Sequence, residues 1–95
     1  MPLAILVTPS FARAVKKLHS KDKATLDENV KAVANEYTIG EEKRGDLNGV
    51  FVHKFKLNNR ETLLAYRLQP DKFNPQALVL LAVGPHENFY VQLKR

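Results

Sequence analysis

Apolar residues recur along the chain with two spacings, which distinguish its extended segments from its helical ones. Residues Leu3 to Val7 are continuously aliphatic and predict a short strand. The strand ends at Thr8-Pro9, where a threonine N-cap and a proline in the first turn are typical of a helix start. The next apolar residues follow the i, i+3, i+4, i+7 spacing of one helix face: Phe11, Ala14, Val15 and Leu18.

A second helical stripe follows a break at Leu18-His19-Ser20. We expect Ser20 to be its N-cap and Gly40 to be the C′ residue that ends it. Neither helix can bury its apolar face alone, so the pair predicts a helical hairpin packed on a sheet. The stripe of the second helix consists of Leu26, Val30, Val33 and Tyr37.

Alternation with a period of two then predicts three strands, over residues 49–57, 61–68 and 76–83. Asn58-Asn59 is a typical hairpin turn, and residues 69–75 form a loop. In the first strand Phe51, His53, Phe55 and Leu57 share one face, and Val52, Lys54 and Lys56 share the other. In the second, Leu64, Tyr66 and Leu68 oppose Leu63, Ala65 and Arg67.

The order of these elements is β-α-α-β-β-β, which predicts an α+β fold: a helical hairpin on one face of a small, mostly antiparallel sheet. The chain of 95 residues is long enough for a single domain, spanning residues 1–95. No stretch approaches the roughly 20 apolar residues that span a bilayer, so we expect no membrane contact. The absence of cysteine excludes disulfides and thiolate metal sites, and we expect a cytoplasmic protein.

The chain is basic, with 15 lysines and arginines against 10 aspartates and glutamates and a net charge of +5. This balance favours a polyanionic partner. On the face that the helices leave open, we expect Lys54, Lys56, Arg67 and His86 to converge. The alternative is that the three cations are a solvated face and that His86 is a hydrogen-bonded residue at a strand end.

Such a group of side chains suits RNA cleavage, in which a ribose 2′-hydroxyl attacks the adjacent phosphate. The reaction needs a base, an acid and cations beside the phosphate. Histidine can be either acid or base, and Glu61 and Glu87 are the alternative bases. We expect no cofactor and no metal site, because the three histidines are scattered: His19, His53 and His86.

Further contacts to RNA are predicted at both ends of this surface. Tyr90 and Phe89 are expected to stack on bases, although a C-terminal plug against the core is the alternative for either ring. Lys43 and Arg44 lie in a charge-rich segment that either contacts phosphates or is solvated. The basic tail, Lys94 and Arg95, is expected to bind RNA as well.

Three motifs, in this order along the chain, resemble the RelE/ParE superfamily of bacterial toxins from type II toxin-antitoxin modules. Asp46-Leu47-x-Gly49 resembles the turn that enters the family's meander, and residues 63–68 resemble its "R-L-x-Y-x-x" strand. Gly84-x-His86-x-x-x-Tyr90 is similar to the ending of YafQ-like ribonuclease toxins. The resemblance covers nearly the whole chain.

The resemblance implies a ribosome-dependent mRNA endonuclease that inhibits translation and forms a hetero-oligomer with a cognate antitoxin. It implies an acid or base role for His86, the terminal aromatic role for Tyr90, and phosphate contacts for Lys54 and Lys56. The family's strand arginine is Leu63 here, so Arg67 would supply that charge. ParE-type members instead poison DNA gyrase, and an inactive homologue that only binds its antitoxin is a third alternative.

Overall fold

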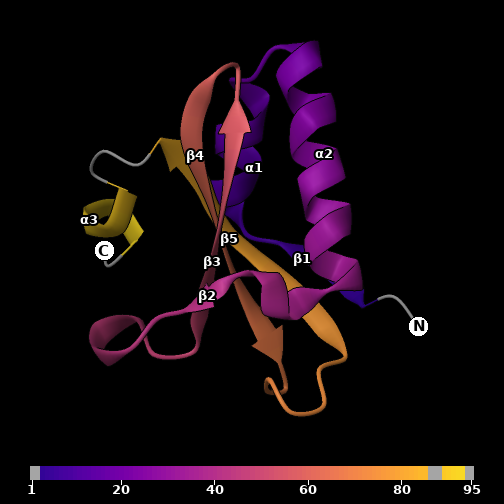
Figure 1. Cartoon of the computed structure of the whole chain (residues 1–95), viewed down its shortest axis with the longest axis vertical. Helices are drawn as coiled ribbons and strands as arrows, with labels where there is room; N and C mark the ends of the chain where they lie inside the picture. The colour runs from indigo at the N-terminus through magenta and orange to yellow at the C-terminus, as the bar shows by residue number, and fades with distance from the viewer. Residues whose placement is uncertain (1–2, 86–88, 94–95) are drawn as a thin grey trace.

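Five strands form one mixed sheet in the order β1-β5-β4-β3-β2 in the computed structural model (Figure 1). The structure describes residues 3–85 and 89–93. β1 runs parallel to β5, and the other neighbouring strands are antiparallel. This sheet confirms the α+β prediction. The strands are β1 Ala4–Val7, β2 Glu41–Glu42, β3 Val50–Leu57, β4 Arg60–Gln69 and β5 Ala77–Pro85.

Helices cover both faces of the sheet, although unequally. α1 (Pro9–Lys16) and α2 (Ser20–Asn35) pack on one face, and the short α3 (Phe89–Leu93) lies on the other side of the strands (Figure 1). Two 3₁₀ turns, Tyr37–Ile39 and Gly45–Leu47, flank β2. No helix in the described part of the chain has both the length and the apolar character to cross a bilayer.

The faces predicted for β3 and β4 are confirmed. Phe51, Leu64 and Tyr66 belong to the core beneath α1 and α2, whereas Val52 and Leu63 belong to a second cluster on the opposite face.

The predicted caps and turns are partly confirmed. The Thr8 side chain accepts a hydrogen bond from the Phe11 N–H at 3.3 Å, and both Asn58 and Asn59 have positive φ.

Two predicted helix ends are wrong. His19, not Ser20, is the N-cap of α2, and its side chain makes no capping hydrogen bond. Gly40 does not end α2, because that helix stops at Asn35 and a 3₁₀ turn follows. Gly40 instead packs against Tyr66, where a Cβ would overlap the Tyr66 hydroxyl. Close packing, rather than helix termination, therefore requires glycine at this position.

The Tyr66 hydroxyl connects the sheet to the segment after α2. It accepts a hydrogen bond from the Gly40 N–H at 3.1 Å and donates one to the Tyr37 carbonyl at 2.7 Å. Tyr66→Phe leaves both backbone groups without this partner, so we expect a loss of about 1–3 kcal/mol in the free energy of unfolding. Chemical denaturation at neutral pH measures it.

The same hydroxyl makes stability depend on pH in the alkaline range. Burial raises the pKa of Tyr66 to about 12, whereas a tyrosine in the unfolded chain titrates near about 10. Between these values the unfolded chain loses the proton first, so the stability that Tyr66 contributes falls as pH rises. The difference between wild type and Tyr66→Phe should shrink over this window; a constant difference would contradict the assignment.

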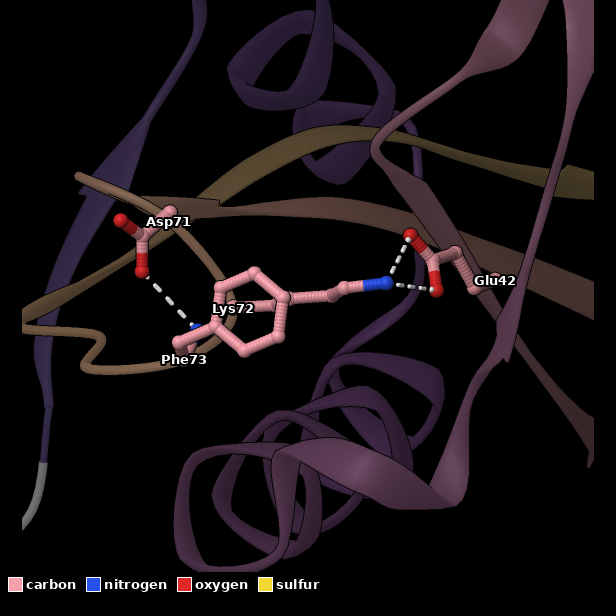
Figure 2. A network of polar contacts seen from close by, with 4 residues as sticks. All are labelled: Glu42, Asp71, Lys72 and Phe73. Carbon is pink, nitrogen blue, oxygen red and sulfur yellow. Dashed lines mark hydrogen bonds and ion pairs between the residues drawn. The ribbon is translucent and has the colours of Figure 1, made fainter.

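The loop between β4 and β5 is tied to β2 by polar contacts. Figure 2 shows the Lys72 ammonium between the two carboxylate oxygens of Glu42, at 2.9 and 3.1 Å. Asp71 accepts hydrogen bonds from the backbone N–H groups of Phe73 and Asn74, which fixes the turn. These groups are exposed, so the ion pair positions the loop while contributing little stability.

Candidate functional site

The C-terminal helix α3 lies on the sheet face that the sequence analysis expected to be open. Phe89 is only 4% exposed and packs with Val50, Val52, Leu63 and Ala65. Tyr90 packs against the same cluster and meets the Phe89 ring edge-on, with centroids 5.6 Å apart. In this conformation Phe89 forms the core plug that the sequence left as an alternative, and Tyr90 stands at the border of that plug.

A hollow of about 380 Å³ lies beside Tyr90, and we call it the Tyr90 hollow. It brings together three residues that the sequence proposed for the site, Lys43, Lys54 and Tyr90. β2 and the residue after it supply Glu41 and Lys43, β3 supplies Lys54, and α3 supplies the aromatic ring. The complete lining is Ile39, Glu41, Lys43, Val52, Lys54 and Tyr90.

Lys43 is held in the Tyr90 hollow by three kinds of contact. Its ammonium pairs with the Glu41 carboxylate and lies 5.2 Å from the centroid of the Tyr90 ring. Its backbone N–H donates to the Val50 carbonyl at 2.8 Å. The hydrogen bond with Glu41 raises the pKa of Lys43 and lowers the pKa of Glu41. The hollow therefore holds a cation that is paired with Glu41 and lies next to an aromatic ring.

Lys54, Lys56 and Arg67 are exposed on the same sheet face, as predicted, but they do not converge. Lys54 lies opposite Leu63, whereas Arg67 lies opposite Val50, four positions along the same hairpin. At roughly 3.3 Å per residue this separates them by roughly 13 Å. Lys56 lies opposite Glu61 and lines neither the Tyr90 hollow nor the larger one around Arg67. Arg67 is therefore too far from Lys54 to supply the charge of the family's strand arginine. That arginine's position is occupied here by Leu63, which is fully buried.

Arg67 lines a different and larger hollow, of about 730 Å³, on the other side of Phe89. The charged residues around it are Arg13, Lys17, Asp46 and Arg67, and much of the remaining lining is apolar. Arg13 and Lys17 were not predicted from the sequence as neighbours of Arg67. Their spacing of four residues places them on one side of α1, but only the packing of α1 against β5 brings that side to the sheet.

The remaining predicted residues lie elsewhere. Arg44 is exposed just before the Gly45–Leu47 turn and lines neither hollow. His86, Glu87, Lys94 and Arg95 lie outside the described residues. His53 faces the helices, where its ring bonds to the Asn29 side chain at 3.0 Å and burial lowers its pKa. Within residues 3–85 and 89–93, no three His, Cys, Asp or Glu side chains gather closely enough to hold a metal ion.

The end of β5 lies at the level of Lys54, with β4 between the two strands. Lys54, Leu63 and Gly84 occupy one level across β3, β4 and β5, because Leu63 pairs with both of the others. Pro85, the last residue of β5, pairs with Thr62. The Gly84-x-His86 motif therefore begins at the level of Lys54, at the opposite end of the hairpin from Arg67.

Solved structures with the same fold include RelE toxins, both free and in complex with an antitoxin. The toxin-antitoxin complex RelBE2 from Mycobacterium tuberculosis matches with a TM-score of 0.74 and 22% identity, covering 90% of this chain and 100% of that one. A free Escherichia coli RelE toxin with two arginines replaced by alanine gives 0.72 and 18%, covering 99% and 94%. The archaeal RelE-RelB complex from Pyrococcus horikoshii gives 0.62 and 14%, covering 92% and 98%. These similarities establish the fold.

Sequence comparison identifies the family. Comparison with curated proteins finds no match. A family model described as "ParE-like toxin of type II bacterial toxin-antitoxin system" matches residues 5–94, which is nearly the whole chain. The expected RelE/ParE relationship is thereby confirmed. The chain belongs to the ParE-like toxins of type II bacterial toxin-antitoxin systems.

Proposed function

We propose that this toxin cleaves mRNA on the ribosome and so inhibits translation. The observation that carries the proposal is the Tyr90 hollow, which brings together Lys43, Lys54 and an aromatic ring at the level of the sheet where β5 ends. A nucleotide bound there has its phosphate near the cations and its base against Tyr90. The next residue after β5 in the sequence is His86, the proposed acid or base.

The proposed reaction breaks one bond of the RNA backbone and forms another. A base removes the proton from the ribose 2′-hydroxyl, and the oxygen attacks the adjacent phosphorus. The bond from phosphorus to the 5′-oxygen of the next nucleotide breaks, and an acid protonates that oxygen. Lys54 stabilises the additional negative charge on the phosphate. The proposed site of action is the cytoplasm, where translated mRNA is available.

The proposed protein partner is a cognate antitoxin that forms a hetero-oligomer with this chain. Two of the structural neighbours described above are toxin-antitoxin complexes. The net charge of +5 favours an acidic, extended antitoxin segment that covers the basic surface around Lys54 or displaces α3. Either arrangement blocks the Tyr90 hollow.

A second candidate function is poisoning of DNA gyrase. Leu63 favours it, because the position at which ribonuclease relatives are expected to carry an arginine is fully buried under α3 here. The matching family model is also described as ParE-like. A gyrase poison needs no RNA-cleaving groups, so this function tolerates the loss of that cation.

Primer extension on a reporter mRNA, translated in a purified bacterial system, tests the proposal. We expect new 5′ ends only on translated message, with none in a control that lacks ribosomes. A parallel supercoiling assay with purified gyrase tests the second candidate. Intact message together with blocked supercoiling would replace the proposed function by gyrase poisoning. Intact message with normal supercoiling would leave an inactive homologue that binds only its antitoxin.

Charge removal separates the roles of the strand lysines. Lys54→Ala should weaken binding to RNA and reduce its dependence on salt by about one phosphate contact, because Lys54 lines the Tyr90 hollow. Lys56→Ala should have less effect, because Lys56 lines neither hollow. Filter binding over a range of salt concentrations measures both. Lys31→Ala, which removes the same charge from the exposed side of α2, is the control, and an equal effect there would remove Lys54 from the site.

A further inference from the structure

Strand β1 has the features of a pairing surface. It is the last strand at one edge of the sheet, pairs only with β5, and is exposed along all four residues. Of the five large apolar side chains exposed in the described part of the chain, three are consecutive in β1. They are Ile5, Leu6 and Val7, at 44%, 48% and 53% exposure. Edge strands usually carry charges, proline or a bulge that prevent pairing, and β1 has none of these.

The backbone of β1 offers hydrogen-bonding groups on its outer side. The Ala4 N–H donates to the Gln76 carbonyl at 3.1 Å, and the Thr8 N–H donates to the Leu80 carbonyl at 3.2 Å. Even-numbered residues therefore direct their backbone groups toward β5. Because these directions alternate along a strand, the N–H and C=O groups of Ile5 and Val7 point away from the sheet.

We propose that two copies of this chain pair through β1 in antiparallel orientation, with a two-fold axis at Leu6. In this register Ile5 of each copy exchanges two hydrogen bonds with Val7 of the other, and Leu6 faces Leu6. All four backbone groups named above are then satisfied, and the two sheets become continuous. Among the two-fold registers, an axis at Leu6 pairs both outward-pointing residues of β1, Ile5 and Val7, within the four-residue strand.

A second copy fits this edge better than a charged partner does. The strand reads Ala-Ile-Leu-Val, so an acidic peptide or a nucleic acid finds no charge to recognise on it. The same uncharged row is complementary to itself, because antiparallel pairing puts Leu6 against Leu6 and Ile5 against Val7. β1 and α3 lie on opposite sides of the molecule in Figure 1, so this pairing leaves the Tyr90 hollow open. The proposal does not depend on the RNA-cleaving activity.

Salt distinguishes this association from polyanion binding. Each copy carries a net charge of +5, so the two copies repel one another, and added salt should strengthen the dimer. Binding to RNA should weaken under the same change. Since the strand is short, we expect a weak, concentration-dependent dimer rather than a permanent one.

The absence of cysteine from the chain allows a direct test of the register. In Leu6→Cys the two thiols face one another across a non-hydrogen-bonded pair, whose Cα separation of about 4.5 Å permits a disulfide. Ile5→Cys is the matched control, because Ile5 faces Val7 of the other copy and the two introduced thiols do not meet. Under mild oxidation of the full chain, we expect Leu6→Cys to form a covalent dimer and Ile5→Cys to remain monomeric on a non-reducing gel.

A substitution without a thiol checks the same interface in solution. Leu6→Lys places two ammonium groups opposite one another, and should weaken the dimer at least about tenfold in sedimentation equilibrium. Its melting temperature reports whether the monomer still folds. Equal cross-linking of both cysteine variants, or a wild-type chain that stays monomeric at high concentration and high salt, would overturn the proposal. The proposal would also be overturned if the backbone N–H groups of β1 are protected from hydrogen exchange only when an extended segment of another protein is bound.

Discussion

His86→Ala should reduce cleavage of translated mRNA by about 100- to 10,000-fold, the range expected when a general acid or base is removed. The histidine follows directly after Pro85, the last residue of β5, in the sequence. β5 in turn ends at the level of Lys54, which lines the Tyr90 hollow. Quantitative primer extension over a time course measures the rate, and thermal melts of the same preparations report folding.

His19→Ala is the matched control for this experiment. His19 is exposed at the start of α2, makes no capping hydrogen bond, and lines neither hollow. We therefore expect its removal to leave cleavage unchanged. If His86→Ala cleaves at the wild-type rate while melting normally, the acid or base must be another group. Glu61, which lies opposite Lys56 on the same sheet, would then be tested next.

Phe51→Ala should lower the free energy of unfolding by about 3–5 kcal/mol, the usual cost of a cavity left by a buried phenylalanine. Phe51 is buried between the sheet and the helical hairpin. Its ring stacks on Tyr66, directly opposite on β4, with centroids 5.5 Å apart. The substitution removes this contact along with the buried area. Urea denaturation with a common slope for both proteins measures the change.

Phe73→Ala controls for the chemistry of the substitution. Phe73 is 83% exposed on the loop before β5 and contacts the Lys72 ammonium at 5.4 Å from the ring centroid. Removal of its ring leaves no cavity, so we expect the free energy of unfolding to change by no more than about 0.5 kcal/mol. Comparable losses of stability in Phe51→Ala and Phe73→Ala would show that Phe51 does not face the helical hairpin.

Local patterns were sufficient to predict most of the fold. The alternation of large and polar residues in β3 and β4 assigned each side chain to the correct face, because the period of a strand admits only two faces. Thr8-Pro9 marked the start of α1, and Asn58-Asn59 marked the hairpin turn. β5 is apolar throughout, so its pattern did not reveal the irregular register opposite Ala65 and Tyr66.

Sequence also indicated most of the residue types of the candidate site, but not their arrangement. Lys43, Lys54 and Tyr90 were each proposed from separate segments, and they line one hollow. Arg67 was assigned to the same group and lies in the other hollow. Strand parity gives the face of a residue, whereas the distance along the hairpin depends on which residues pair across it. The two-residue turn at Asn58-Asn59 fixes that pairing and places Arg67 opposite Val50, so the expected convergence failed because it used the strand faces without this register.

Long-range packing accounts for what local sequence did not predict. Gly40 reads as a helix terminator, yet its role depends on a tyrosine 26 positions later in the chain. The aromatic pair Phe89-Tyr90 reads equally well as a binding platform or as a plug, because exposure is not encoded in residue type. α3 resolves this by burying Phe89 and placing Tyr90 at the rim of a hollow. Periodicity thus specified the elements and their faces, whereas contacts between distant segments set the position and accessibility of the site.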